Sequence, residues 1–189
     1  DFRLAALNRT TAVDRSYFAN VCFLGDSLTV GFSDYQINLS GALICGYTGV
    51  GPDAIVNHAA VKSPTRGQEV ALDVLAAAQP KKLYILLGTN VLNRDGDYSS
   101  FLTYYRLMLD MIAQALPNTQ IYVQSITPVR PEVSQKENHE GLNRDRLCKI
   151  NDELAAIALE KNCYFLNLWE VLADENGDLK AEYAQPDGY

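Results

Sequence analysis

Short apolar runs alternate with longer amphipathic stretches along this chain. The apolar runs cover residues 21–24, 42–45, 83–87, 121–124 and 163–166. Brief, nearly continuous runs of this kind are typical of parallel strands that are covered on both faces. Strands that alternate with helices form βαβ units with right-handed crossovers. The pattern therefore predicts an α/β fold with a doubly wound parallel sheet of about five strands.

The stretches between these runs repeat apolar residues at helical spacing. The spacing predicts one helix from Phe101 to Leu116 and a second from Leu147 to Ala158. A third helix is predicted over Arg66–Gln79, just before Pro80, because proline ends helices. A fourth begins near Leu28. The alternation continues without an internal repeat or a linker, so we expect a single domain over residues 21–189, preceded by an N-terminal arm or extra helix over residues 1–20.

The charge balance limits the partners of the protein. Sixteen basic and 23 acidic residues give a net charge of -7, and no stripe of Lys and Arg is visible. Binding to nucleic acid or to an anionic membrane surface needs such a stripe, so neither is expected. No apolar run approaches the roughly 18–20 residues that a transmembrane helix needs. With nucleic acid and membrane surfaces disfavoured, the expected partner is a small molecule or a carbohydrate.

The four cysteines do not form a metal-binding or redox motif. Cys22, Cys45, Cys148 and Cys163 are widely spaced, and no C-x-x-C is present. We expect buried free thiols, with one disulfide as the alternative. No group of His, Cys and Asp has ligand spacing, so the sequence predicts neither a metal nor a cofactor.

Four segments directly follow predicted strands and are expected at the ligand-binding edge of the sheet. They are residues 25–27, 46–51, 88–90 and 125–128. The long polar stretch Thr127–Asn143 is irregular in pattern, and such a loop is often functional, for instance as a lid.

Ser27 stands where a nucleophile would belong. It follows a buried strand at the start of a helix, so its hydroxyl is expected at the sheet edge and its N–H at an anion-favouring helix terminus. The alternative is that Ser27 only caps the helix. Asn90 would present an amide that can donate to an oxyanion, or would simply cap a turn. A phosphate or nucleotide site is disfavoured, because Asp26 repels phosphate and the glycines of the loop 46–51 are spaced in the reverse of the dinucleotide order.

These segments resemble the SGNH hydrolases, the GDSL-type esterases and lipases. The first block of that family is similar to Gly25-Asp26-Ser27-Leu28, its glycine block to Gly46-Tyr47-Thr48-Gly49, and its G-x-N block to Gly88-Thr89-Asn90. Its final D-x-x-H block is similar to Asp187-Gly188-Tyr189, with the histidine still to come. The resemblance runs from about residue 20 to residue 189. It implies a three-layer α/β/α sandwich with a flavodoxin-like parallel sheet.

The resemblance also implies roles. Ser27 would be the nucleophile, and Asp187 would orient the catalytic histidine. The N–H groups of Ser27 and Gly49 and the amide of Asn90 would form the oxyanion hole, with Gly51 as the alternative to Gly49. Tyr47 and Tyr189 would shape the pocket.

The expected histidine is the main departure from the family. It would be residue 190, one past Tyr189, and the family helix that follows it would also be missing. We therefore expect a chain truncated before its last helix, nearly inactive as given and active in a longer form. His58 and His139 do not fit the block: a structural or surface role is expected for His58, whereas His139 lies in a loop that could approach the site.

The leading hypothesis is a serine ester hydrolase that acts through an acyl-enzyme at Ser27. Short acyl esters, including O-acetyl groups on carbohydrate, are favoured as substrates. The alternative is a non-catalytic module of the same fold that binds a carbohydrate or an ester.

Overall fold

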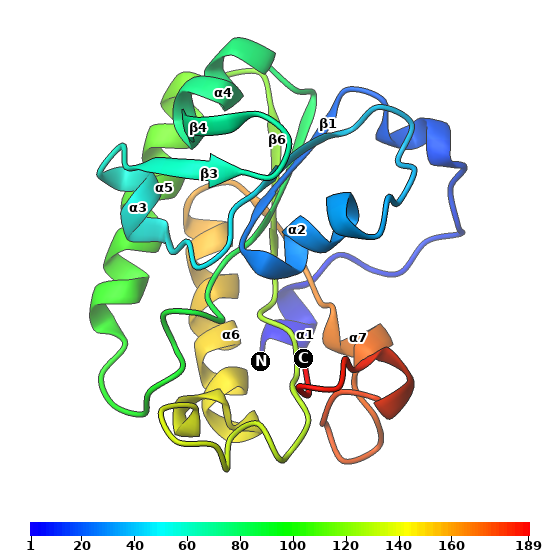
Figure 1. The fold of residues 1–189 in the computed structure, drawn as a ribbon, viewed down its shortest axis with the longest axis vertical. Helices are drawn as coiled ribbons and strands as arrows, with labels where there is room; N and C mark the ends of the chain where they lie inside the picture. The colour runs from blue at the N-terminus through cyan, green and yellow to red at the C-terminus, as the bar shows by residue number, and fades with distance from the viewer.

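The computed structural model describes residues 1–189 and contains a five-stranded parallel sheet (Figure 1). The strand order is β2-β1-β5-β6-β7. The strands are β1 (Val21–Gly25), β2 (Leu43–Gly46), β5 (Lys82–Leu86), β6 (Gln120–Gln124) and β7 (Tyr164–Leu166). The chain leaves β1 toward β2 on one side and later returns to β5 on the other. This reversal is a topological switch point, and ligands bind beside such points at the carboxyl ends of the strands.

Helices lie on both faces of the sheet, which confirms the predicted α/β/α fold class. The longer helices are α2 (Ser27–Asp34), α4 (Ala71–Ala78), α5 (Ser99–Ala115) and α6 (Arg144–Glu160). The shorter ones are α1 (Phe2–Ala5), α3 (Pro52–Val56) and α7 (Trp169–Leu172), with 3-10 helices at Arg15–Phe18, Glu140–Leu142 and Ala181–Tyr183. Helices α5 and α6 correspond to the two clearest predicted helices and begin two and three residues earlier, at Ser99 and Arg144; α5 ends at Ala115, one residue before the predicted end.

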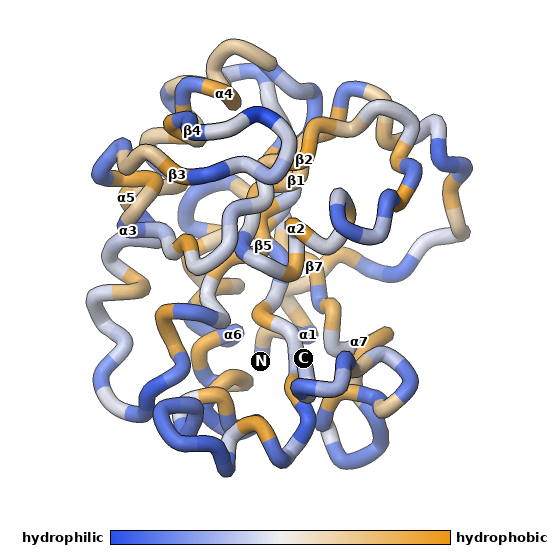
Figure 2. Tube along the Cα trace, in the orientation of Figure 1, coloured by the Kyte–Doolittle hydropathy of each residue, from blue (hydrophilic) through white to orange (hydrophobic).

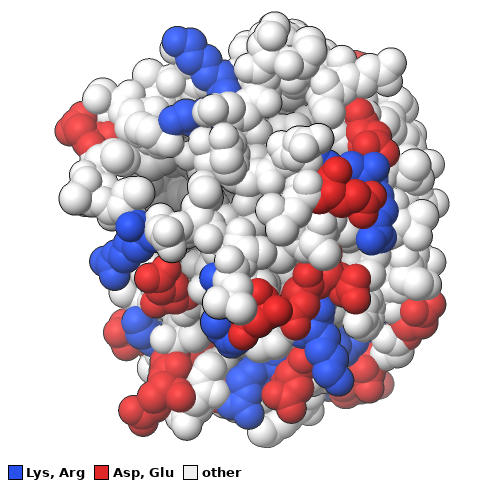
Figure 3. All heavy atoms as spheres, turned by 180° about the vertical axis from the view of Figure 1, so that it is seen from behind, with Lys and Arg blue, Asp and Glu red and all other residues white.

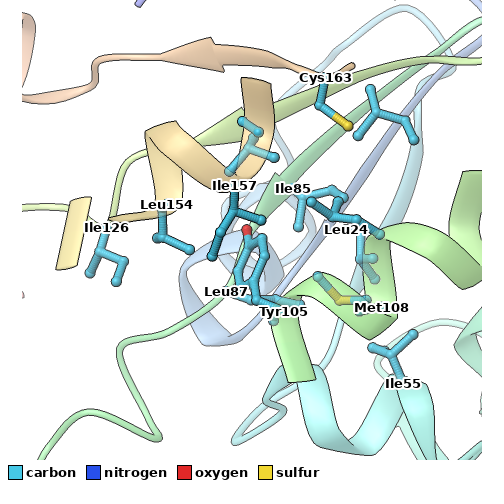
Figure 4. Packing of buried hydrophobic residues seen from close by; sticks show 14 of the residues in the cluster. Leu24, Ile55, Ile85, Leu87, Tyr105, Met108, Ile126, Leu154, Ile157 and Cys163 are labelled. Carbon is cyan, nitrogen blue, oxygen red and sulfur yellow. The ribbon is translucent and has the colours of Figure 1, made fainter. Parts of the chain in front are cut away.

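The main core lies between the sheet and the layer of α3, α5 and α6. It is a cluster of 35 buried residues, to which alternate positions of each strand contribute, such as Cys22 and Leu24 of β1. Figure 4 shows Tyr105 of α5 at the centre of this packing, among side chains from the strands and from α6. Burial raises the pKa of Tyr105, whose hydroxyl has no hydrogen-bond partner.

The opposite face of the sheet carries a row of aromatic rings. Phe23, Tyr84, Tyr122 and Tyr164 come from four adjacent strands, and their successive ring centroids are 5.3, 4.6 and 4.9 Å apart. Phe18 of the 3-10 helix and Phe32 of α2 pack against this row. Aromatic rings bury a large apolar area each, so a few residues packed against them are enough to cover this face of the sheet.

One predicted helix is wrong over its first half. Residues 66–79 were expected to be helical, but β3 (Ala60–Ser63) and β4 (Gly67–Val70) form an antiparallel hairpin, and α4 begins only at Ala71. Gly67 has φ +85°, a conformation that a helix does not accept. The predicted end before Pro80 is right, because Gln79 adopts the left-handed conformation that closes α4.

The distribution of polarity follows this architecture. Figure 2 shows apolar residues concentrated in the strands and polar residues in the loops at the lower end of the molecule. On the face seen in Figure 3, basic and acidic side chains are interspersed over the lower half, and those of the upper half lie mainly toward its edges. None of the helices combines the length and the apolar character that crossing a bilayer requires.

Candidate active site

Ser27 is the first residue of α2, directly beyond the end of β1. The helix is capped by Asp26, whose side chain accepts a 3.1 Å hydrogen bond from the Leu28 N–H. The alternative that Ser27 serves as the cap is therefore wrong. The Ser27 side chain is exposed and lines a cavity. A hydroxyl at this helix terminus lies where main-chain N–H groups and the helix dipole favour negative charge.

Two glycines allow the strand and the helix to meet this closely. A Cβ on Gly25 would lie 2.0 Å from Thr29 Oγ1 and 2.6 Å from the Leu86 carbonyl oxygen. A Cβ on Gly46, at the end of β2, would lie 2.6 Å from the main-chain nitrogen of Val30. Only glycine fits at both positions, and α2 is thereby held against the strand ends.

Asp26 is buried beside the predicted nucleophile. The residue is fully buried, and its Oδ2 has no hydrogen-bond partner. Burial raises the pKa of Asp26 to about 6, against the lowering effect of its hydrogen bond from Leu28. Loss of solvation penalises the charged carboxylate, so this acid holds its proton to a higher pH than an exposed aspartate does.

Asn90 lines the same cavity as Ser27. It lies beyond the end of β5, which pairs with β1, and the turn that carries it is closed by hydrogen bonds from the Val91 and Leu92 N–H groups to the Gly88 carbonyl, both 3.1 Å. The Asn90 Nδ2 is buried and has no partner within the protein. A buried amide donor without an acceptor carries a desolvation cost, which an oxygen atom of a ligand would relieve.

The glycine loop after β2 lies at the same edge of the sheet but does not border the cavity. Gly49 is exposed, has φ +78° and has open space around its Cβ position, whereas Gly51 is buried against Val91 and Asp53. Tyr47, predicted to shape the pocket, is fully buried and does not line it; its hydroxyl donates to Glu69 instead. Its main-chain N–H donates to the Gly25 carbonyl at 2.9 Å, so the loop is tied to β1.

The C-terminal segment brings Asp187 and Tyr189 to the cavity wall. Lys136 Nζ donates to the Asp187 carbonyl oxygen at 2.5 Å, and the Arg130 N–H donates to the Gly188 carbonyl at 3.0 Å. The carboxylate of Asp187 is exposed and accepts only from the Tyr189 N–H, at 3.3 Å. It is therefore accessible to a further donor.

The polar loop Thr127–Asn143 forms a fixed wall of the cavity rather than a free lid. Val133 and Leu142 are fully buried, and the Gly141 N–H donates to the Asn93 carbonyl at 2.7 Å. Arg146 of α6 donates from Nη1 to the carbonyl oxygens of Leu92 and Gly141, both at 2.9 Å. The segment after Asn90 and the polar loop are thus joined through one guanidinium group.

The two histidines lie in different environments. His58 follows α3, is exposed and does not line the cavity, as expected for a surface residue. His139 is half-buried and lines the cavity. The sequence placed His139 only in a loop, because its position depends on contacts between distant segments that no local pattern records.

The cavity has a volume of about 660 Å³, which lies within the range of small-molecule sites. Beyond the predicted residues, its lining includes apolar side chains from α2, the following loop and the C-terminal segment, such as Phe32, Ile37, Leu172 and Leu179. Asn93 adds a polar group. Sequence reasoning missed these residues; the only available signal was that Phe32 follows Ser27 on the same helix. No group of three or more His, Cys, Asp or Glu side chains is placed to hold a metal ion.

The sequence of residues 23–188 matches the GDSL-like lipase/acylhydrolase family. The chain belongs to this family. No curated protein matches this chain.

Solved structures of the same fold support this assignment. A Streptococcus pneumonia protein whose name refers to platelet activating factor has a TM-score of 0.70 and 21% identity, with 89% of this chain and 74% of that chain covered. A GDSL-like lipase from Bacteroides thetaiotaomicron has a TM-score of 0.64 and 16% identity, over 89% and 77% of the two chains. An acetyl xylan esterase has a TM-score of 0.55 and 12% identity, over 78% and 76%. At these identities the similarity shows a common fold, and the family supports ester hydrolysis in general terms.

Proposed function

We propose that this protein cleaves carboxylic esters through an acyl-enzyme on Ser27. The observation that carries this proposal is the pairing of Ser27 with the unpartnered amide of Asn90 in one cavity. A nucleophile at a helix N-terminus, together with a buried donor that lacks an acceptor, matches what a developing oxyanion needs.

The proposed reaction gives each group at the site a role. Ser27 Oγ bonds to the carbonyl carbon and gives its proton to the imidazole of the histidine that the family's D-x-x-H block implies, which Asp187 would orient. The negative oxygen accepts hydrogen bonds from the Ser27 N–H and from Asn90 Nδ2, and the Gly49 N–H is the proposed third donor, from a loop at the same edge of the sheet that does not line the cavity. Collapse of this intermediate releases the alcohol, which takes the proton from the imidazolium. Water then attacks the acyl-enzyme by the same route and releases the acid.

We favour esters with a short acyl group, including O-acetyl groups on carbohydrate. The cavity wall combines apolar side chains with the polar groups of Asn93, Gln185 and Asp187, which suits a polar alcohol part better than a long lipid chain. A structure of the same fold is an acetyl xylan esterase, whose name refers to such a substrate.

Labelling with a fluorophosphonate probe tests the proposal. In a form of the protein that includes the histidine of the D-x-x-H block, we expect covalent labelling and hydrolysis of p-nitrophenyl acetate, both lost in Ser27→Ala, with a fall in kcat of about 10³-fold or more. Ser33→Ala, which changes a serine on the same helix that does not line the cavity, is the matched control and should keep both. Absence of labelling in the folded wild-type protein would favour a binding module instead.

A further inference from the structure

The tautomer of His139 follows from its surroundings. Its Nδ1 lies 3.0 Å from the carbonyl oxygen of Glu137. A carbonyl oxygen can only accept, so Nδ1 carries the proton in this contact. In a neutral imidazole the other nitrogen is then an acceptor. His139 is one of the residues that line the cavity, and Nε2 is the acceptor that remains on its ring.

Main-chain hydrogen bonds fix the backbone at His139, and the Tyr189 ring packs against its imidazole. The His139 N–H donates to the Lys136 carbonyl at 3.1 Å, and the His139 carbonyl accepts from the N–H of the buried Leu142 at 3.0 Å. The ring also meets the Tyr189 ring edge-on, with centroids 6.4 Å apart and planes at 64°. A side chain fixed before binding loses little conformational entropy when it meets a ligand.

The neighbours of His139 indicate which part of an ester would meet it. Asn93, Asp187 and the Tyr189 ring line the same cavity, so acceptor groups and an aromatic surface occur together. A polyhydroxylated alcohol offers both hydrogen-bond donors and C–H faces that rest against aromatic rings. A plain alkyl alcohol offers no donor to these acceptors.

We propose that His139 is a specificity-determining residue, which accepts through Nε2 a hydrogen bond from a hydroxyl group on the alcohol part of the ester. This inference rests on the proposed ester hydrolysis at Ser27. It adds the group that distinguishes a hydroxylated alcohol from an alkyl alcohol of the same size.

The test compares two acetate esters with ring-containing alcohols of similar size. One is an acetylated methyl glucoside and the other is cyclohexylmethyl acetate, and the quantity measured is the ratio of their kcat/KM values. His139→Phe keeps a ring beside Tyr189 and removes the acceptor. We expect this variant to lower the ratio about 3- to 10-fold, since a neutral hydrogen bond contributes about 0.5–1.5 kcal/mol.

Two further variants make the result specific. His139→Gln retains an acceptor oxygen and should restore part of the ratio, whereas His58→Phe, on an exposed histidine outside the cavity, should leave the ratio at the wild-type value. Thermal unfolding of each variant, with a melting temperature near that of the wild type, shows that it is folded, because a misfolded variant would lose activity on both esters alike. In folded His139→Phe, a ratio equal to that of the wild type overturns the inference, and an equal fall in both activities would place His139 in acyl transfer itself. If Ser27→Ala still hydrolyses either ester, the proposed function fails instead.

Discussion

Tyr47 donates its phenolic hydroxyl to Glu69 Oε1 at 2.8 Å and thereby joins the loop after β2 to the β3–β4 hairpin. Arg66 completes the contact with two hydrogen bonds to the same carboxylate, at 2.7 and 3.0 Å, and a third to the Ile44 carbonyl at 3.1 Å. Burial would raise the pKa of Glu69, but the hydrogen bonds from Arg66 and Tyr47 hold it below its usual range. The loop that carries Gly49 is thus anchored from outside the cavity.

Glu69→Gln tests this anchor. The Glu69 side chain is only 11% exposed, so loss of its charge weakens the contact with Arg66 and is expected to cost about 1–3 kcal/mol of unfolding free energy. Loosening of the loop should lower kcat more than it raises KM, because the Gly49 N–H is proposed to act only on the oxyanion. Urea unfolding and steady-state kinetics measure the two effects. Glu153→Gln, at an exposed position of α6 without an ion pair, is the control; equal behaviour of the two variants would contradict the anchor.

Asp26 predicts an unusual dependence of stability on pH. Its pKa is about 6 in the folded protein against 3.8 for an ordinary aspartate, so the folded state binds the proton more tightly than the unfolded chain. The stability that protonated Asp26 contributes is complete below pH 3.8 and is lost as the pH rises through about 6. Asp26→Asn, which keeps a capping oxygen, should therefore raise the unfolding free energy by about 1–3 kcal/mol at pH 8.

The gain from Asp26→Asn should shrink as the pH approaches 4, and urea titrations at several pH values measure it. Asp34→Asn, on an exposed aspartate at the end of α2, controls for a general change in charge. A gain that does not vary with pH would show that the buried carboxylate is not its source.

Asn90→Ala should lower kcat on p-nitrophenyl acetate by about 10²–10³-fold with little change in KM, because the lost donor acts on the transition state. The variant should still react with the fluorophosphonate probe, although more slowly, because Ser27 remains. Asn8→Ala, in the exposed N-terminal arm, serves as the comparison. If kcat stays within twofold of the wild type, Asn90 is not an oxyanion donor.

Asn151 stabilises the segment that enters the cavity wall after β6. This buried side chain accepts from the Ile126 N–H at 2.8 Å and donates to the Ile126 carbonyl at 3.1 Å. Asn151→Leu leaves the buried Ile126 N–H unpaired, and we expect a loss of about 2–4 kcal/mol in urea unfolding. A loss below 1 kcal/mol would mean that another group satisfies Ile126.

Local sequence patterns were enough to predict the five-stranded sheet and the two longest helices, α5 and α6. The apolar runs are short because each strand is covered on both faces, and the stripes on α5 and α6 face a single core. The hairpin was missed because Arg66 and Glu69 have good helix propensity, whereas their contacts with Ile44 and Tyr47, together with the positive φ of Gly67, decide against a helix.

Only part of the candidate site was predictable, because the predicted residues Gly49 and Tyr47 do not line the cavity. Ser27 and Asn90 each follow a strand directly, so strand order alone brings them to one cavity. The position of His139 depends instead on the contact between Gly141 and Asn93, which lie far apart in sequence. The sequence could not identify which residue caps the N-terminus of α2, because Asp26 and Ser27 are both favoured cap residues.

The contacts of Lys136 and Arg130 with the last residues have a consequence for synthesis. Translation proceeds from the N-terminus, so Ser27 leaves the ribosome long before Asp187 exists to support a proton acceptor. Under the proposed mechanism, an unfinished chain carries an unreactive serine. Hydrolysis begins only when the segment that holds Asp187 has packed against the polar loop.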